Sequence, residues 1–273
     1  MTTKPSHQLS LVTFNTLGTP LLAPDITKRY QYIAQEINKR DYDIICLQEL
    51  FTYYHFFLFK KTLTNYPYVI YQKNPLGPRG GLVIFSKLKL TTKEFFTYIR
   101  PSHANVPLYV PLAQPGMLSA IIESFGIRIC TTHLSSDVVH NLTPKNKLYQ
   151  LIKSQTQEAA KLVNQYTKNG YPLILTGDFN IAKHSDLHEE FIKQTSASDV
   201  FVKEERPTYD PDRTTFFYKS PPGRIDFIFT KSRQEIKPIL TEHIFIDKII
   251  LEDGKKSYPS DHIGLHCILN LNK

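Results

Sequence analysis

The chain has 273 residues, of which 41% are hydrophobic and 21% are charged, a balance typical of a globular protein. We predict one domain over residues 1–273, because a single α/β core often reaches this length. Lys and Arg outnumber Asp and Glu by 33 to 25, and the resulting net charge of +8 favours polyanionic partners. No apolar tract is long enough to cross a bilayer, and Met1–Gln8 lacks the apolar centre of a signal peptide, so we expect a cytoplasmic protein.

Short apolar runs separated by turn residues predict a sheet-rich core. In chain order the predicted strands are Leu9–Phe14, Asp43–Leu47, Tyr68–Tyr71, Gly81–Ser86, Leu118–Ser124, Ile127–Thr132, Leu173–Thr176, Ile225–Thr230 and Ile263–Leu271. Helical periodicity occurs in Ile26–Ile37 and Leu148–Tyr166. The pair Thr143-Pro144 suits the start of the second helix, and Asn169-Gly170 suits its end. We expect both helices to lie on sheet faces.

Two further segments and the cysteines complete this description. Four prolines between Tyr98 and Met117 predict a long loop that shapes access to a substrate. The aromatic stretch Phe51–Phe59 is open to two interpretations, contact with a membrane or packing of the rings against the sheet, and the second is favoured. Each cysteine sits inside an apolar run, which predicts buried thiols without a disulfide or a zinc site: Cys46, Cys130 and Cys267.

Polar side chains suited to metal or phosphate chemistry follow or interrupt six apolar runs. They are Asn15, Glu49, His133, Asp178 with Asn180, Asp226, and Asp261 with His262. Each alone has a plain structural interpretation as a turn, a helix cap or a hydrogen-bonded histidine. Because strand ends in layered sheets can gather distant positions into one crevice, we predict that these side chains converge on a single site.

Phosphodiester hydrolysis needs a hard cation on the phosphate oxygens, a nucleophilic water and donors for the growing negative charge. Glu49 is the predicted Mg²⁺ ligand, since this ion takes few protein carboxylates and keeps several waters. Asn15 and Asp261 are predicted to complete or support that shell of ligands.

The remaining polar residues supply the water and the donors. Asp178 and Asn180 alternate along an extended segment, so their side chains should emerge on one face, one holding the water and the other donating to phosphate. His133 is predicted to donate to a nonbridging oxygen. Asp226 is predicted to fix the tautomer of His262 and to support the charged ring.

At these residues the chain resembles the endonuclease/exonuclease/phosphatase superfamily. The resemblance spans Asn15 to His262 and rests on Thr132-His133-Leu134, Gly177-Asp178-Phe179-Asn180 and Ser260-Asp261-His262. It implies an α/β fold, a four-layered α/β sandwich of two packed, mainly antiparallel sheets flanked by helices, with the site at one edge. It also implies Mg²⁺ or Mn²⁺ as cofactor.

The same resemblance implies roles at individual positions. Asn15 and Glu49 are similar to the first metal-site pair, and Asp261 to the late metal-associated acid. His133 resembles the histidine that contacts phosphate, while Asp178 resembles the acid that orients the water and Asn180 the amide on phosphate. Asp226 resembles the acid that orients the catalytic histidine, which is His262. Leu17 stands where AP endonucleases carry an acid, so a second metal position on that side is not expected.

Enzymes that act on DNA, RNA, lipids and inositides share these motifs, so the motifs do not identify the substrate. Thr13–Asn15, Leu47–Leu50 and Tyr258–Leu265 are similar to the tyrosyl-DNA phosphodiesterase pattern, although the chain has no Trp. Thr132–Leu134 followed by a Gln-rich helix is equally similar to neutral sphingomyelinases and deadenylases. We predict a Mg²⁺-dependent phosphodiesterase acting on nucleic acid, without an obligate protein partner. The alternatives are a phospholipid phosphodiesterase at a membrane, a small-molecule phosphatase, and a binding protein without chemistry.

Overall fold

The structure is a computed structural model that describes residues 7–98, 114–136, 144–168, 170–214 and 220–271. Its helices are α1 (Ile26–Lys39), α2 (Tyr53–Thr62), α4 (Lys147–Thr167) and α5 (Asp186–Thr195). Sheet A has the strand order β11 (Lys237–Ile244), β14 (Gly264–Asn270), β1 (Gln8–Asn15), β2 (Ile44–Gln48), β4 (Pro78–Ser86) and β3 (Tyr68–Lys73). Sheet B has the order β5 (Leu90–Thr97), β6 (Gly116–Ile122), β7 (Ile127–His133), β8 (Leu173–Asp178), β10 (Asp226–Lys231) and β9 (Ser198–Asp199). A separate hairpin pairs β12 (Ile249–Ile250) with β13 (Lys256–Ser257), and a 3₁₀ turn spans Pro211–Arg213.

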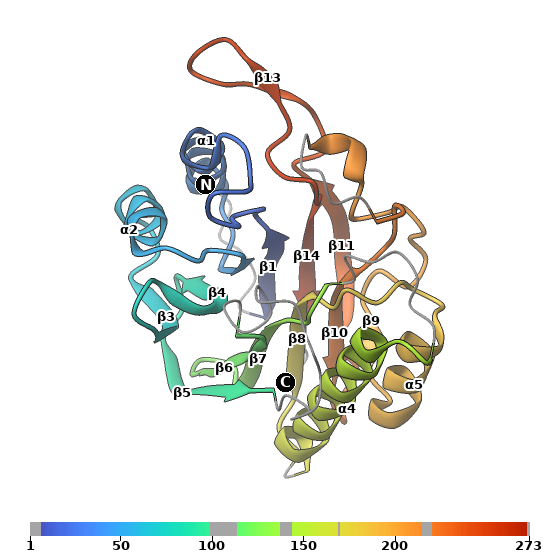
Figure 1. The fold of residues 1–273 in the computed structure, drawn as a ribbon. Coiled ribbons are helices and arrows are strands. Elements are labelled where there is room, and N and C mark those ends of the chain that lie inside the picture. The colour runs from blue at the N-terminus through green and yellow to red at the C-terminus, as the bar shows by residue number, and fades with distance from the viewer. Residues whose placement is uncertain (1–6, 99–113, 137–143, 169, 215–219, 272–273) are drawn as a thin grey trace.

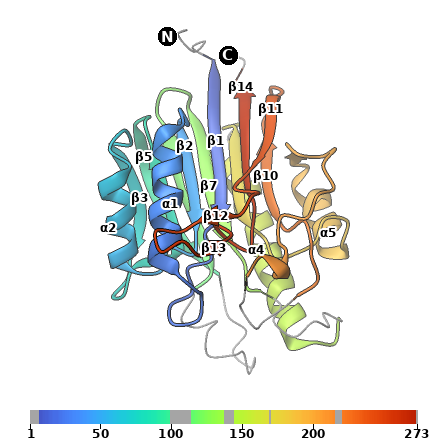
Figure 2. The ribbon, with the colours of Figure 1, turned by 90° about the horizontal axis from the view of Figure 1, so that it is seen from above.

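The two sheets pack face to face, with α1 and α2 on the outer face of sheet A and α4 and α5 on the outer face of sheet B (Figures 1 and 2). Alternation of side chains along the strands builds these layers. In β1, Leu9 and Leu11 enter the core between the sheets, whereas Val12 and Phe14 pack on the helix side. The predicted four-layered α/β sandwich is therefore confirmed.

Each sheet contains one parallel pair, β1 with β2 and β7 with β8, while its other neighbours are antiparallel. The sheets are thus mixed, with antiparallel pairs in the majority. The parallel pairs bring the carboxyl ends of four strands to one edge of the sandwich. Antiparallel β10 and β14 begin at this same edge, because Asp226 pairs with Asp178 and Leu265 pairs with Thr13.

The long helix α4 starts later than the sequence indicated. Asn146 is its N-cap, and the side chain of Asn146 accepts a hydrogen bond from the backbone of Leu148. Pro144 therefore precedes the helix, and Thr143 lies outside the described residues. An amide cap one residue before the first helical turn satisfies a free N–H group, which explains the later start. The predicted end of the helix agrees better with the structure, since the helix runs to Thr167.

The aromatic stretch after β2 forms helix α2, and the favoured interpretation, packing of the rings against the sheet, holds for part of it. Phe56 and Phe59 are buried against sheet A. Tyr54 and Phe57 are exposed on the opposite side of the same helix. All three cysteines are buried and free, as predicted. Among the described helices, none combines the length and the hydropathy needed to span a membrane. Most of the proline-rich loop, residues 99–113, lies outside the described part of the chain.

Candidate active site

All the residues that the sequence singled out lie at the shared edge of the two sheets. Asn15, His133 and Asp178 end β1, β7 and β8, Glu49 follows β2, Asn180 follows β8, Asp226 begins β10, and Asp261 and His262 precede β14. Four of them come from sheet A and its flanks and four from sheet B. The site therefore lies across the seam between the sheets.

Asn15 joins the two halves of the site. Its Nδ2 atom donates to Oε1 of Glu49 at 3.1 Å and to Oδ2 of Asp178 at 2.9 Å. Its Oδ1 atom accepts a hydrogen bond from the backbone of Leu17. In this orientation Asn15 fixes the two carboxylates with its amide hydrogens, so it supports the predicted metal ligands rather than offering an oxygen of its own.

Glu49 is held on a strained backbone. Its φ angle of +64° lies in the left-handed region that non-glycine residues rarely adopt, and such strain concentrates at functional sites. Its Oε2 atom accepts from the backbone of Gly18 at 2.9 Å and from Thr19 Oγ1 at 3.1 Å. A Cβ atom on Gly18 would lie 1.9 Å from the Tyr30 hydroxyl, so only glycine fits there. The loop after β1 is thus shaped to orient the Glu49 carboxylate.

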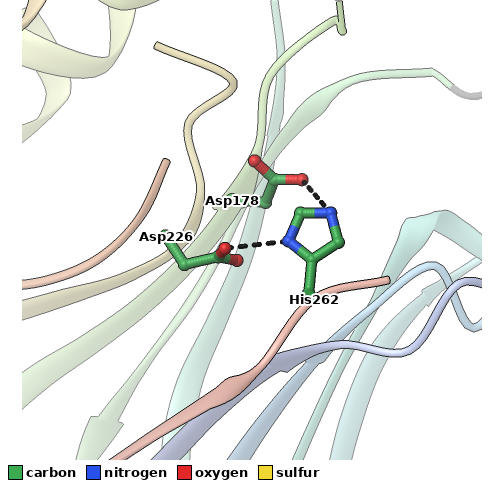
Figure 3. A group of neighbouring side chains, drawn as sticks. All are labelled: Asp178, Asp226 and His262. Atoms are coloured by element: carbon green, nitrogen blue, oxygen red, sulfur yellow. Dashed lines mark hydrogen bonds and ion pairs between the residues drawn. The ribbon is translucent and has the colours of Figure 1, made fainter. Parts of the chain in front are cut away.

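Two histidines face the buried carboxylate of Asp178. Nε2 of His133 lies 3.4 Å and Nε2 of His262 lies 3.7 Å from Oδ2 of Asp178. On its other side, Nδ1 of His262 is hydrogen-bonded to Oδ2 of Asp226 at 2.8 Å (Figure 3). The backbone of Asn180 donates to Oδ1 of Asp178, which leaves Oδ2 facing the histidines.

These contacts set the protonation states of the site. Burial raises the pKa of Asp178 to about 6, although His262 opposes the shift. Burial lowers the pKa of His262, but the carboxylates of Asp226 and Asp178 outweigh it and raise that pKa to about 10. At neutral pH Asp178 is therefore largely ionised and the His262 ring is a cation. This combination supplies a proton acceptor and a positive charge side by side.

The predicted extended segment through Asp178 and Asn180 is wrong, because β8 ends at Asp178 and Asn180 lies in a bend. Its φ angle is +51°, and its Nδ2 atom donates to the backbone oxygen of Leu134 at 2.9 Å. One amide hydrogen is used in this bond, and the second has no acceptor among the described residues.

The segment that carries Asp261 and His262 is held by two arginines that the sequence analysis did not identify. Arg29 of α1 is buried and donates to the backbone oxygens of Thr16, Leu17, Pro24 and Pro259. Arg213 donates to the next carbonyl along, Ser260 O, at 3.1 Å. The two consecutive carbonyls that precede Asp261 therefore each accept a hydrogen bond from a different arginine. The available signal was Arg29 itself, a charge within the apolar stripe formed by Ile26, Tyr30 and Ile33 of the helix.

Two hydroxyl groups were also missed. Thr208 Oγ1 accepts from the backbone of Ile225 and Asp226 at 3.0 Å, and Thr208 O accepts from Ile263 at 2.7 Å. Ser260 Oγ donates to Asn15 O at 2.8 Å. Both therefore fix the backbone on either side of the Asp226–His262 pair. Ser260 belongs to the motif Ser260-Asp261-His262, in which no role was predicted for it, whereas nothing in the sequence around Thr208 distinguishes it.

The donor set fits a divalent cation that prefers oxygen. Four carboxylates, Glu49, Asp178, Asp226 and Asp261, meet at one edge, and the last three are buried. Oδ1 of Asp226 is buried and has no hydrogen-bond partner among the described residues. Burial raises the pKa of Asp261, and the charge of Glu49 raises it further. A hard cation such as Mg²⁺ would neutralise this excess of negative charge.

A pocket of about 590 Å³ opens from the site between the loops of both sheets. Glu49 and His133 are the two site residues that line it. Its other walls are mainly apolar and are formed by Thr19, Pro20, Leu21, Leu22, Phe51, Thr52, Asn74, Leu76, Pro78, Gly80, Pro115, Leu134, Ser135 and Ser136. Among these described lining residues there is no Lys or Arg.

Comparison with known proteins agrees with this architecture. The chain is 24% identical over 283 residues to the Drosophila melanogaster protein named "Putative neutral sphingomyelinase", a match that covers 97% of the chain and 61% of that relative. The chain thus corresponds to about three fifths of the relative's length. D. rerio TDP2 in complex with a single-strand DNA product has a TM-score of 0.71 at 19% identity, with 96% of this chain and 99% of that chain covered. Sphingomyelinase C from Streptomyces griseocarneus has a TM-score of 0.66 at 17% identity, with 97% and 99% covered.

The likeness to these solved structures shows a common fold. A family model adds more, because its match runs from residue 12 to residue 262 and so includes every site residue described above. The chain therefore belongs to the Endonuclease/Exonuclease/phosphatase family.

Proposed function

We propose that this protein is a divalent-cation-dependent phosphodiesterase that cleaves the head group of a phospholipid. One observation carries the proposal: Glu49 and His133 of the site line a pocket whose other walls are mainly apolar. A phosphodiester that carries an apolar chain on one side matches both parts of this site.

The chemistry is assigned to the chain's own side chains. Glu49, with Asp261 nearby, would hold Mg²⁺ or Mn²⁺, and the bound ion would polarise the phosphoryl group. The ionised Asp178 would orient the attacking water and accept its proton through Oδ2. His133, protonated His262 and the free amide hydrogen of Asn180 would donate to the oxygens on which negative charge grows. Asp226 would keep the His262 ring charged and correctly turned.

The pocket separates a lipid from a nucleic acid on physical grounds. Binding of a nucleic acid strand depends on cations for the phosphates on either side of the scissile bond and on aromatic rings for the bases. The described pocket walls provide one ring, Phe51, and no cation. The leucines and prolines that line the pocket would instead gain free energy by covering an acyl or sphingoid chain.

A nucleic acid, which the sequence analysis favoured as substrate, is the second candidate. The net charge of +8 supports it, as does the fold shared with a protein solved in complex with single-strand DNA.

A substrate panel tests the proposal. Sphingomyelin and phosphatidylcholine vesicles, single- and double-strand oligonucleotides, bis(p-nitrophenyl) phosphate and p-nitrophenyl phosphate are incubated with the protein, with Mg²⁺ and with EDTA. We expect Mg²⁺-dependent release of phosphocholine and slower cleavage of the soluble diester. Faster cleavage of an oligonucleotide would replace the first candidate by the second, and preference for the monoester would contradict both.

A pocket variant adds a sharper test. Leu22→Lys places a charge in the apolar wall and should raise the apparent KM for the lipid by about tenfold without changing cleavage of bis(p-nitrophenyl) phosphate. Leu240→Lys on β11 is the matched control, because Leu22 and Leu240 are similarly exposed at 45% and 42%. An equal effect of both variants would show that the pocket does not bind the apolar part.

A further inference from the structure

The stretch between Glu49 and Glu94 contains no acidic residue. Within it are seven cations: Lys60, Lys61, Lys73, Arg79, Lys87, Lys89 and Lys93. In the fold this stretch forms α2, β3, β4 and the start of β5, which lie together along one flank of the molecule (Figures 1 and 2). One side of the protein is therefore basic, and this side adjoins the active-site pocket through Phe51, Leu76 and Pro78.

The cations of this flank differ in how well they are neutralised. Lys87 pairs with Asp41 and Lys89 with Glu123. In contrast, Lys60, Lys61 and Lys73 have no carboxylate within ion-pair distance in the part of the chain that the structure describes, and their side chains are exposed. These three lysines are free to bind anions from outside.

Large apolar side chains are exposed on the same flank. Tyr54 and Phe57, one turn apart on α2, are 67% and 56% exposed, and Leu76 in the loop between β3 and β4 is 74% exposed. The backbone of Tyr53 donates to Leu76 O at 3.2 Å, so the start of α2 lies against this loop. Leu76 and the fully exposed Leu21 both line the active-site pocket. The apolar groups thus lead from α2 to the entrance of the site.

We propose that this basic flank, with Tyr54, Phe57 and Leu76 as the inserting side chains and Lys60, Lys61 and Lys73 as the charged border, docks the protein on an anionic phospholipid surface. The proposal extends the proposed lipid function, since docking here would present the pocket mouth to lipid head groups. Exposed aromatic and leucine side chains bordered by lysines are typical of surfaces that lie in the membrane interface.

The nature of the apolar groups favours a membrane over a nucleic acid. Rings alone would serve equally for base stacking, but Leu76 and Leu21 have no π face and gain nothing from a base edge. An acyl layer would cover both leucines and rings.

The hairpin of β12 and β13 is a less suitable anchor, although Ile250 on it is 70% exposed. Glu252 and Asp253 lie two and three residues after Ile250, and an anionic surface would repel them. Asp253 and Lys255 of the hairpin are also ion-paired with Lys28 and Asp25 near the start of α1. Ile250 therefore provides a variant that tests the alternative location.

Vesicle flotation tests the proposal with the full chain, in Mg²⁺ and in EDTA. Phosphatidylcholine vesicles with and without phosphatidylserine are the probes. We expect binding to the anionic vesicles that weakens as salt rises. The triple variant Tyr54→Ser/Phe57→Ser/Leu76→Ser should lose at least tenfold in partitioning, and Lys60→Gln/Lys61→Gln/Lys73→Gln should lose the preference for phosphatidylserine.

Matched controls give the experiment its specificity. Tyr171→Ser/Val202→Ser/Ile239→Ser removes three side chains of similar exposure, and Lys161→Gln/Lys168→Gln/Lys193→Gln removes the same charge from other surfaces. Equal losses in the controls, a loss on Ile250→Ser alone, or tighter binding to an oligonucleotide than to anionic vesicles would each overturn the proposal. Cleavage of bis(p-nitrophenyl) phosphate by the wild-type chain is measured in parallel. If that cleavage persists while vesicle binding never occurs, the docking surface is wrong and the phosphodiesterase proposal stands.

Discussion

His262 donates from Nδ1 to Oδ2 of Asp226 over 2.8 Å, and both side chains are buried. Together with Asp178, this carboxylate raises the pKa of His262 to about 10, so the ring stays charged below that pH. Replacing Asp226 by Asn removes a negative charge and lowers that pKa, and the protonated ring is then lost at a lower pH. We expect kcat to fall by about a hundredfold and its alkaline limb to move towards neutrality.

The measurement is kcat against pH for the wild type and for Asp226→Asn, with Mg²⁺ activation titrated for both. An alkaline limb that stays in place would contradict the role of Asp226. A loss of metal affinity in proportion to the loss of rate would instead make Asp226 a ligand.

Asp178 should couple stability to pH when no divalent ion is bound. Its pKa is about 6 in the folded protein, above the ordinary value of 3.8, so the folded state binds this proton more tightly. Stability contributed by the protonated form is complete at low pH and is lost as pH rises from about 4 to above 6. In Asp178→Asn this loss is absent. Between pH 4 and pH 8 the free energy of unfolding of the variant should therefore improve relative to wild type by on the order of 3 kcal/mol.

Urea unfolding in EDTA at several pH values measures this difference. The comparison uses the pH dependence alone, so a constant penalty from the new amide group does not affect it. A difference between the two proteins that is independent of pH would show that Asp178 is not a perturbed acid.

Removal of the divalent ion should abolish hydrolysis and lower the melting temperature. EDTA would leave Glu49, Asp178 and Asp261 facing one another without a counterion. Adding Mg²⁺ or Mn²⁺ should restore activity and raise the Tm of the wild type, because an ion that binds only the folded state stabilises it. Glu49→Gln should show a smaller rise in Tm at equal ion concentration. A Tm that responds equally in both proteins would place the ion elsewhere.

Arg29 should be needed both for stability and for the position of Asp261 and His262. Arg29→Met leaves four carbonyls without their donor, three of them in buried bonds, and the free energy of unfolding should fall by about 3 kcal/mol or more. Arg29→Lys keeps the charge but fewer bonds, so stability should return in part while kcat remains low. Arg40→Met, on the same helix with a half-exposed side chain, is the control and should cost below about 1 kcal/mol. Full activity in Arg29→Lys would limit Arg29 to a structural role.

The residue pattern alone was sufficient for a sheet-rich core with two helices on sheet faces and for the edge where the site lies, whereas the four layers were expected from the family resemblance. Strands such as Leu173–Thr176 are recognisable because a strand buried on both faces has a continuous run of apolar residues. The polar residues that end such runs stand out against that background, which is why Asn15, Asp178 and His133 were identifiable.

Elements without such contrast were not identifiable. β11 is exposed along most of its length and carries Lys, Pro, Thr, Glu and His among its eight residues, so no alternation marks it as a strand. The hydrogen bond from Arg29 to the backbone oxygen of Pro259 joins positions 230 residues apart. The hydrogen bonds of Thr208 with Ile225 and Asp226 depend on the path of a loop. Contacts of this kind follow from the assembled fold and leave no local pattern in the chain.

The amide of Asn15 reaches from one sheet to a carboxylate of the other, and Gln48 makes a second such link to Thr131 at 2.9 Å. The distances between the reacting groups are consequently set by how the two sheets pack against each other. A modest change in the volume of an interior leucine or isoleucine between the layers would shift one half against the other. Hydrolysis would then decline at temperatures where the protein is still fully folded, and turnover would serve as a sensitive gauge of interior fit.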